Sequence, residues 1–327
     1  IPPMLEPLLN PGTVAVIGAS RNPQKIGYAI LDNLIRGGFS GEIVPVNASA
    51  DSVQDRKCFR RLKDYTGGVD LGLICVPAPA VETAAEEAID AGARAVVVVS
   101  AGFKEIGPEG AEREERLRRL CQDGNVRLLG PKSLGVINTR NRMNASFAKH
   151  MPKTGGISVL SESGAMCTAI LDWAAAKQLG LSKVVSIGNK ADLNEIDFLK
   201  LFAEDDETRV VVGYLESISS GDLFIKAAEQ LASEKPVVLY RAGITKAGAR
   251  AVRAHTGNLP GEDIAYAAAF KRAGVVRADS LEALFDCAAA LARQPLPAGG
   301  RVAIVSNGGG PGVVAADALE EAGLELA

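Results

Sequence analysis

The chain has 327 residues, of which 47% are hydrophobic and 5% aromatic, with 35 glycines and a formal charge of −3. This length and apolar content predict two or three globular domains, and the near-neutral charge gives no indication of nucleic-acid binding. The five cysteines are far apart with no CxxC pair, which argues against a zinc or other metal site and against a disulfide framework. A reducing, cytoplasmic location fits this cysteine usage. The longest apolar stretch, residues 93–103, is too short to span a membrane.

The first half of the chain alternates strand patterns with helical patterns. Runs typical of buried strands lie at residues 13–18, 42–47, 71–77, 93–100 and 126–131. Helical segments such as residues 27–38 and 79–93 separate them. This alternation predicts a doubly wound parallel sheet with right-handed crossovers. We therefore expect an α/β, Rossmann-like domain over residues 1–148.

The same pattern restarts after "KHMPKTGG" (149–156). Four further strand patterns lie within residues 156–166, 181–193, 208–217 and 235–243. We expect a second doubly wound domain over residues 152–293. After a Pro/Gly-rich linker, residues 298–327 read as a strand, a glycine turn and a helix. One such unit cannot bury a sheet alone, so we expect the start of a truncated third domain.

Two loops of the first half have features of a ligand site. "VAVIGASRNPQKIG" (14–27) is a strand, a turn and a helix start, which can hold a phosphate through backbone N–H groups. It lacks the GxGxxG pattern, and Asn47 ends the second strand where an NAD site has an acidic residue, so NAD is disfavoured. "CVPAPAV" (75–81) predicts a rigid shelf at the carboxyl edge of the sheet. A plain tight turn and a merely stiff loop remain the alternative interpretations.

Two stretches of the second half could carry phosphoryl chemistry. In "LSESGAM" (160–166), hydroxyl and N–H groups before a helix could receive a phosphoryl oxygen. Glu162 opposes this unless its side chain points away or caps the helix. In "AVRAHTGNLPGED" (251–263), His255 at a loop–helix junction could be a phosphoryl nucleophile, and it then needs a partner on its other ring nitrogen. Glu216, at a strand end, is the candidate partner; otherwise His255, like His150, is structural.

Taken together, these motifs resemble the NDP-forming acyl-CoA synthetases, the superfamily that contains succinyl-CoA synthetase. The matching elements include "VIGAS", "PVN", "CVPAP", "SAGF", "YLES" and "AHTG", in the family's order over nearly the whole chain. The resemblance implies an α-subunit-like part with a Rossmann-like coenzyme A domain and a flavodoxin-like ligase domain. It also implies the reaction acyl-CoA + NDP + phosphate ⇌ acid + CoA + NTP, through an acyl phosphate and a phosphohistidine.

The resemblance further implies a role for each matching residue. Gly18, Ala19, Ser20 and Lys25 would lie along the coenzyme A phosphates, and Val46 and Asn47 would border the same site. Val76, Pro77 and Pro79 would form the nucleotide shelf, and Ser100, Ala101 and Gly102 would extend it. Gly130, Pro131 and Gly135 match a loop near the thiol end. His255 matches the phosphorylated histidine, Glu216 the glutamate that orients it, and Ser161, Ser163 and Gly164 the helix start that receives the phosphate.

Several positions depart from the family pattern. Lys132 stands where the family has asparagine, and Glu162 where it has glutamine; Ala254, Asn258 and Pro260 are also substituted. We hypothesise that Lys132 pairs with the acyl carboxylate or phosphate. The family's ATP-grasp module, which uses ATP/ADP with Mg, is expected outside this chain as a further domain or subunit, in an oligomer that acts on CoA and a small carboxylic acid. The rival interpretation is an acyl-CoA-binding regulatory module, as in some protein lysine acetyltransferases.

Overall fold

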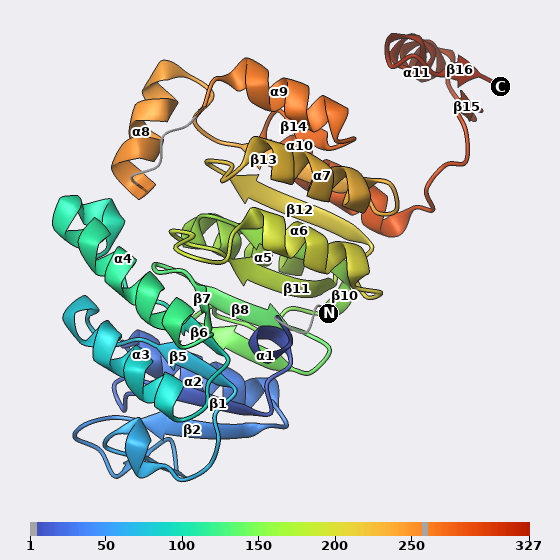
Figure 1. Cartoon of the computed structure of the whole chain (residues 1–327). Helices are drawn as coiled ribbons and strands as arrows, with labels where there is room; N and C mark the ends of the chain where they lie inside the picture. The colour runs from blue at the N-terminus through green and yellow to red at the C-terminus, as the bar shows by residue number, and fades with distance from the viewer. Residues whose placement is uncertain (1–4, 257–260) are drawn as a thin grey trace. The chain divides into compact units, whose positions relative to one another are not determined.

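The computed structural model describes residues 5–256 and 261–327 (Figure 1). It forms two compact units, residues 1–292 and 293–327. Within the described ranges, no helix combines the length and hydrophobicity that a membrane span requires.

The first sheet consists of five parallel strands in the order β2-β1-β5-β6-β7. Their bounds are β1 Thr13–Ile17, β2 Glu42–Val46, β5 Leu71–Ile74, β6 Ala95–Val98 and β7 Arg127–Leu129. The order reverses between β1 and β5, and ligands of open α/β sheets bind in the crevice at such a reversal. The loops that follow these two strands are the two that the sequence marked in this half of the chain.

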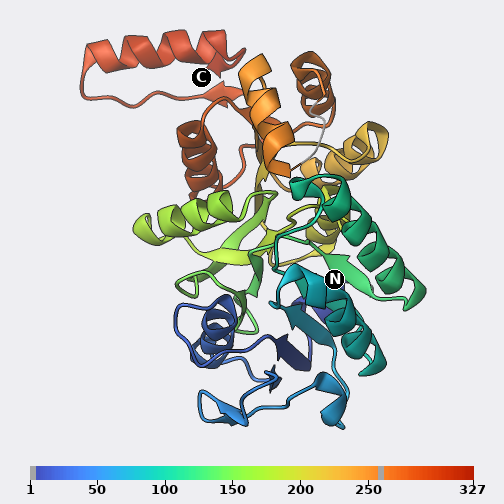
Figure 2. The same ribbon diagram turned by 90° about the vertical axis from the view of Figure 1, so that its left-hand side faces the viewer.

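Helices cover both faces of this sheet. They are α1 Glu6–Leu9 and α2 Ile26–Gly37 on one face, and α3 Val81–Asp90 and α4 Pro108–Asp123 on the other. Figure 2 shows α2 across the sheet from α3 and α4. The connections contain a hairpin, β3 Ser52–Val53 and β4 Arg56–Lys57, and three single turns, η1 Leu62–Asp64, η2 Ala78–Ala80 and η3 Lys104–Ile106.

The second sheet has seven strands in the order β14-β13-β12-β10-β11-β8-β9. Their bounds are β8 Gly135–Asn138, β9 Met143–Ser146, β10 Thr154–Ser161, β11 Leu181–Ser186, β12 Val210–Leu215, β13 Val237–Arg241 and β14 Val276–Ala278. The run from β14 to β11 is parallel, and β8 and β9 extend it antiparallel through β11. The strands β8 and β9 lie before residue 148, so they belong to the second sheet although their residues fall within the range predicted for the first domain. The predicted domain limits stay predictions.

Helices again cover both faces of the second sheet. They are α5 Gly164–Ala176 and α10 Leu281–Arg293 on one face, and α6 Glu195–Glu204, α7 Gly221–Ala232 and α9 Asp263–Arg272 on the other. A further helix, α8 Lys246–Thr256, follows β13 and contacts η3 of the first half. The predicted fold class, two doubly wound α/β sheets, is confirmed.

One apolar core runs from the first sheet into the second. Buried residues of α2 such as Leu31 belong to the same cluster as Val185 of β11 and Phe198 of α6. Two smaller clusters fill the outer faces, under α3 and α4 and under α5 and α10. The two sheets therefore share one hydrophobic interior.

The second unit contains β15 Arg301–Val302, α11 Gly309–Glu321 and β16 Glu325–Leu326. The strands β15 and β16 pair in parallel, one on each side of the helix in the chain. Val305, Val313 and Val314 are exposed in this unit.

Candidate active site

The turn after β1 is built by close backbone packing. Gly18 has φ +100°, and a Cβ there would lie 2.9 Å from the carbonyl carbon of Cys75. A Cβ on Gly27 would lie 1.9 Å from the Gly18 oxygen, so only glycine lets α2 approach the turn this closely. The N–H groups of Gly18 and Ala19 donate to the Val46 carbonyl at 2.9 and 3.0 Å. These two N–H groups are therefore already bonded within the protein, and the contact of this turn with a phosphate stays a prediction.

Asn47 fastens this turn to the loop after β2. Its Nδ2 donates to the Ala19 carbonyl at 2.6 Å, and its Oδ1 accepts from the N–H of Ser49 at 2.8 Å. An asparagine fits here because it offers a donor and an acceptor at once. Asn47, which stands where an NAD site has an acidic residue, thus holds the two loops together.

The predicted shelf is braced by the loop after β6. The prolines Pro77 and Pro79 are exposed at the sheet edge, and the Ser100 hydroxyl donates to the Val76 carbonyl at 2.5 Å. Gly102, with φ +105°, donates its N–H to Glu105 Oε1 at 2.6 Å, next to exposed Ala101. Two consecutive strand ends therefore form one fixed edge.

The loop that contains Gly130, Pro131 and Gly135 connects the two halves. Pro131 and Gly130 accept backbone hydrogen bonds from Asn189 and Ala191 at 2.8 and 3.0 Å. Gly135 has φ +116° and a Cβ there would lie 2.2 Å from the Ala145 oxygen, so this position requires glycine.

Lys132 in this loop adopts the left-handed conformation, with φ 60°. Asparagine tolerates this region better than lysine, which accounts physically for the asparagine of the family pattern. The Lys132 ammonium donates to the His255 carbonyl at 2.8 Å. The lysine thus joins the first-half loop to α8; its pairing with substrate stays a prediction.

His255, predicted at a loop–helix junction, lies in the last turn of α8. Its Nδ1 is 3.1 and 3.2 Å from the two carboxylate oxygens of Glu216. Glu216, directly after β12, is 2% exposed, whereas the His255 side chain is 45% exposed. Since Nδ1 faces the carboxylate, Nε2 is the ring nitrogen left for chemistry.

The turn between β10 and α5 holds itself together with its hydroxyl groups. The Ser161 hydroxyl donates to the Ser163 carbonyl at 2.8 Å and accepts from the Ser163 N–H at 3.2 Å. The Ser163 hydroxyl caps α5 by accepting from Met166 N at 3.3 Å. The turn therefore presents the N-terminus of α5, beginning at Gly164, where backbone N–H groups and the helix dipole favour an anion.

Glu162 of the same turn is buried, and its carboxylate is bonded inside the protein. Its Oε1 lies 2.9 Å from Lys190 Nζ and accepts from the Ser217 N–H at 3.0 Å. Lys190 also pairs with Glu195 at 3.1 Å. Burial disfavours the charged lysine, but Glu162 and Glu195 outweigh it and raise the pKa of Lys190. Lys190 thus offsets part of the negative charge of Glu162 and Glu195, while burial raises the pKa of Glu162. Through the Ser217 N–H, the Glu162 carboxylate positions the loop that carries Glu216.

A cavity of about 390 Å³ brings these parts together. Lys132, Ser163, Gly164 and His255 line it, so three predicted stretches of the chain meet there. The predicted residues of the first domain from Gly18 to Gly102 lie on neighbouring loops and do not line this cavity. Asn258 and Pro260 lie outside the described residues.

The sequence analysis did not predict a polar network that joins the first half of the chain to the second. Asn189, which also lines the cavity, donates to Glu105 and Glu114, and Lys104 donates to the Asn189 carbonyl at 2.5 Å. The available signal was the "GNK" triplet directly after a buried strand, where polar residues of an α/β protein meet at the ligand edge.

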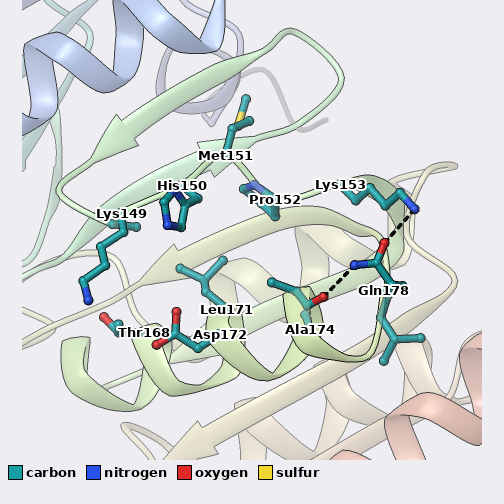
Figure 3. A pocket seen from close by; sticks show the side chains of 13 residues that line it. Lys149, His150, Met151, Pro152, Lys153, Thr168, Leu171, Asp172, Ala174 and Gln178 are labelled. Carbon is teal, nitrogen blue, oxygen red and sulfur yellow. Dashed lines mark hydrogen bonds between the residues drawn. The ribbon is translucent and has the colours of Figure 1, made fainter.

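His150 lies in another cavity, of about 240 Å³, between residues 148–153 and α5. Figure 3 shows its ring above Leu171, with Lys149 and Asp172 nearby. Thr168 contributes to the walls of both cavities. The two histidines line different cavities, although the cavities share Thr168.

Two observations concern the possible metal ligands and thiols in the part of the chain that the structure describes. No group of three or more His, Cys, Asp or Glu side chains there could hold a metal ion. Burial raises the pKa of Cys75, Cys121 and Cys167 to about 12, so these thiols stay protonated at neutral pH.

Comparison with known proteins defines the class that this fold and site represent. A model described as "CoA binding domain" matches residues 12–139, and one described as "Succinyl-CoA ligase like flavodoxin domain" matches residues 154–291. The chain is thus a CoA-binding domain joined to a ligase domain of the succinyl-CoA ligase type.

Individual relatives narrow this class. The chain is 41% identical to subunit alpha of the acetate–CoA ligase [ADP-forming] I of Pyrococcus furiosus, covering 98% of this chain and 71% of the relative. It is 44% identical to the acetate–CoA ligase [ADP-forming] I of Archaeoglobus fulgidus, covering 99% and 47%. The acetyl-coenzyme A synthetase 1 of Candidatus Korarchaeum cryptofilum, solved with phosphate and ADP, superposes with a TM-score of 0.94 at 38% identity, covering 99% and 70%.

The chain therefore belongs to the ADP-forming acyl-CoA ligases, and it corresponds to their alpha-subunit part. The family resemblance seen in the sequence motifs is confirmed. The chain spans somewhat less than half the length of the Archaeoglobus relative.

Proposed function

We propose that this chain performs the CoA-dependent and phosphohistidine steps of an ADP-forming acyl-CoA ligase. An acyl-CoA and phosphate would give an acyl phosphate and free CoA, and the acyl phosphate would then phosphorylate His255. The observation that carries the proposal is the contact between His255 Nδ1 and buried Glu216 at a cavity edge. A binding-only module, the alternative, has no use for a histidine held in this way.

The phosphoryl step follows from the tautomer of His255. With the proton on Nδ1 and donated to Glu216, the Nε2 lone pair is free to attack the phosphorus of the acyl phosphate. The new N–P bond forms as the P–O bond to the acyl group breaks, and the carboxylate leaves with the bonding electrons. The phosphorylated ring keeps its Nδ1 proton, which Glu216 continues to accept.

The surroundings of the cavity favour a phosphoryl group. The N-terminus of α5 after Ser163 provides a partial positive charge, and Lys132 contributes to the lining of the same cavity. The ion pair with Lys190 reduces the repulsion between Glu162 and the anion. Phosphate recognition would thus rest on backbone groups and Lys132, while Ser161 and Ser163 maintain the turn.

The first-half loops would hold coenzyme A. Ser20, Lys25 and the start of α2 would face its phosphates, and the shelf of Val76, Pro77 and Pro79 its nucleotide part. The loop from Gly130 to Gly135 would direct the thiol end toward the cavity that contains His255.

The remaining components would be supplied by partners. We expect an ATP-grasp domain or subunit to bind ATP/ADP with Mg and to exchange the phosphoryl group with His255. The substrate would be a small carboxylic acid and the assembly an oligomer in the cytoplasm. The designation of the Pyrococcus relative as a subunit alpha supports a partner subunit.

The test uses the full chain with acetyl phosphate labelled on phosphorus. The wild type is expected to incorporate acid-labile, base-stable phosphate, and His255→Ala is expected to incorporate none. His150→Ala, the second histidine in its separate cavity, serves as the matched control and should label like the wild type. Label retained in His255→Ala, or no label in the wild type, would overturn the proposal.

A further inference from the structure

Asn189 is a buried residue that connects the halves of the active-site region. It lies shortly after β11 and is fully buried. Its backbone N–H donates to the Pro131 carbonyl at 2.8 Å, and its carbonyl accepts from Lys104 Nζ at 2.5 Å. Both backbone groups are therefore used between protein segments, and only its side chain remains for other contacts.

The orientation of the Asn189 amide is fixed by two carboxylates. Its Nδ2 donates to Glu105 Oε2 at 2.7 Å and to Glu114 Oε2 at 2.8 Å. Burial opposes ionisation of Glu105, but hydrogen bonds from Asn189, Gly102 and Phe103 hold its pKa below the ordinary value, so it is an acceptor at neutral pH. An ionised carboxylate cannot donate, so the NH₂ group must face it and Oδ1 must face away.

The Oδ1 atom has no partner among the described residues, although it is buried. A buried carbonyl oxygen without a donor is unfavourable, and such atoms are rare in folded proteins. Asn189 forms part of the wall of the cavity that contains His255, Ser163 and Lys132. The residue that carries the unused acceptor thus lines the same cavity as the reacting groups.

We propose that Asn189 Oδ1 accepts a hydrogen bond from an amide N–H of the pantetheine arm of coenzyme A. This inference rests on the proposed function. Carboxylic acids and acyl phosphates offer acceptors at neutral pH, whereas the arm that brings the thiol to the acyl phosphate carries amide N–H donors. Asn189 is then a positioning residue that orients the arm in the cavity.

The link to the first domain supports this assignment. Glu105, which fixes the amide through Oε2, accepts the Gly102 N–H through Oε1 at 2.6 Å. Gly102 belongs to the loop expected along coenzyme A. One carboxylate therefore couples that loop to Asn189 in the cavity wall, and the arm would run from the loop toward the cavity.

The experiment measures calorimetric binding of coenzyme A, and of an analogue with an ester in place of the amide nearest the thiol, to the full chain. The wild type should bind the ester about tenfold more weakly, since one hydrogen bond is lost. Asn189→Ala should bind coenzyme A about tenfold more weakly and should no longer distinguish it from the ester. Labelling of His255 by acetyl phosphate, which needs no coenzyme A, is measured in the same variant as a check that the site remains assembled.

Two further variants keep the result decisive. Asn138→Ala removes another buried asparagine, bonded to the Leu9 carbonyl and to Asn10, and should bind coenzyme A like the wild type. If Asn189→Ala does not fold, Glu105→Gln replaces it, because a glutamine NH₂ can bond to Oδ1 and withdraw it, which should reduce discrimination against the ester.

The outcomes separate this inference from the proposed function. A wild type that binds no coenzyme A would refute the proposed function. A wild type that binds it, with an Asn189→Ala variant that binds it equally tightly and still rejects the ester, would refute only the role of Asn189. Loss of both coenzyme A binding and His255 labelling would show a structural role and would also overturn the inference.

Discussion

At the scale of single residues, Glu216 decides which nitrogen of His255 can react. We expect Glu216→Gln to slow labelling of His255 by acetyl phosphate about 10²–10⁴-fold, because an amide can donate to Nδ1 and stabilise the wrong tautomer. The rate of acid-labile phosphate incorporation measures this. Glu229→Gln, a half-buried glutamate of α7 that pairs with Arg272, is the control. An unchanged rate in Glu216→Gln would show that the carboxylate does not orient the ring.

Lys190 makes a second residue-scale prediction. Its ammonium lies between Glu162 and Glu195, whose side chains are both fully buried. Lys190→Met leaves two buried carboxylates without a counter-charge, so we expect the free energy of unfolding to fall by about 3–5 kcal/mol. Urea denaturation measures this, with exposed Lys200→Met as the matched control. Adding Glu162→Gln to Lys190→Met should restore part of the loss; a fall below about 1 kcal/mol in Lys190→Met would contradict the argument.

A functional residue could be predicted from the sequence where its place at the end of a buried strand was enough to locate it. Glu216 was paired with His255 because it follows a buried run, and the structure places them in contact. The direction in which the Glu162 side chain points, by contrast, depends on its contact with Lys190. This lysine follows a different strand, and the two side chains meet only in the folded core. Asn189 was missed for the same reason, because its partners Glu105 and Glu114 come from the other half of the chain.

At the scale of elements, α2 depends on one glycine for its approach to β1. Gly27→Ala would place a Cβ 1.9 Å from the Gly18 oxygen, so the helix must move away from the turn. We expect the free energy of unfolding to fall by about 1–3 kcal/mol, as overpacking does elsewhere, together with weaker coenzyme A binding. Gly221→Ala, at the start of α7 with no atom near its Cβ position, is the control and should be neutral or slightly stabilising. Equal stability of the two variants would contradict the close-packing argument.

The central strands could be predicted because parallel strands buried on both faces require uninterrupted β-branched runs. The strands β8 and β9 have no such run, since they are short and antiparallel at the sheet edge, and their place follows from pairing with β11. The end of α8 at Thr256 was also missed. The residues before His255 are helical, but the pattern gives no stop signal before Gly257, so the sequence alone did not decide on which side of His255 the helix lay.

At the scale of the whole molecule, Glu105 contributes a pH-dependent link between the halves. Its folded pKa is depressed below the ordinary value of 4.5, so its stabilisation is present above about that pH and is lost as pH falls through the folded pKa. We expect Glu105→Gln to be less stable than the wild type at neutral pH, and the difference to shrink in acid. Urea denaturation across acidic and neutral pH measures this, with exposed Glu86→Gln on α3 as control. A difference that stays constant with pH would exclude the ionised carboxylate as its source.

The shared core predicts that coenzyme A stabilises both halves together. Asn33 of α2 donates to the carbonyls of Ser146 and Ala148 at 2.8 and 2.6 Å, and one apolar cluster continues through both sheets. Residues 5–256 and 261–292 should therefore unfold in one transition, and coenzyme A at about 100 times its Kd should add about 2.7 kcal/mol to the free energy of unfolding.

The single tryptophan provides the measurement. Trp173 of α5 stacks on Phe285 with ring centroids 4.6 Å apart, so its fluorescence reports the second half of the fold, away from the first-half loops expected to bind coenzyme A. Its transition in urea should move with coenzyme A to the same extent as the transition seen by circular dichroism, because a ligand stabilises every segment that unfolds with its site. A Trp173 transition that coenzyme A leaves in place would show that the two sheets unfold independently despite their common core.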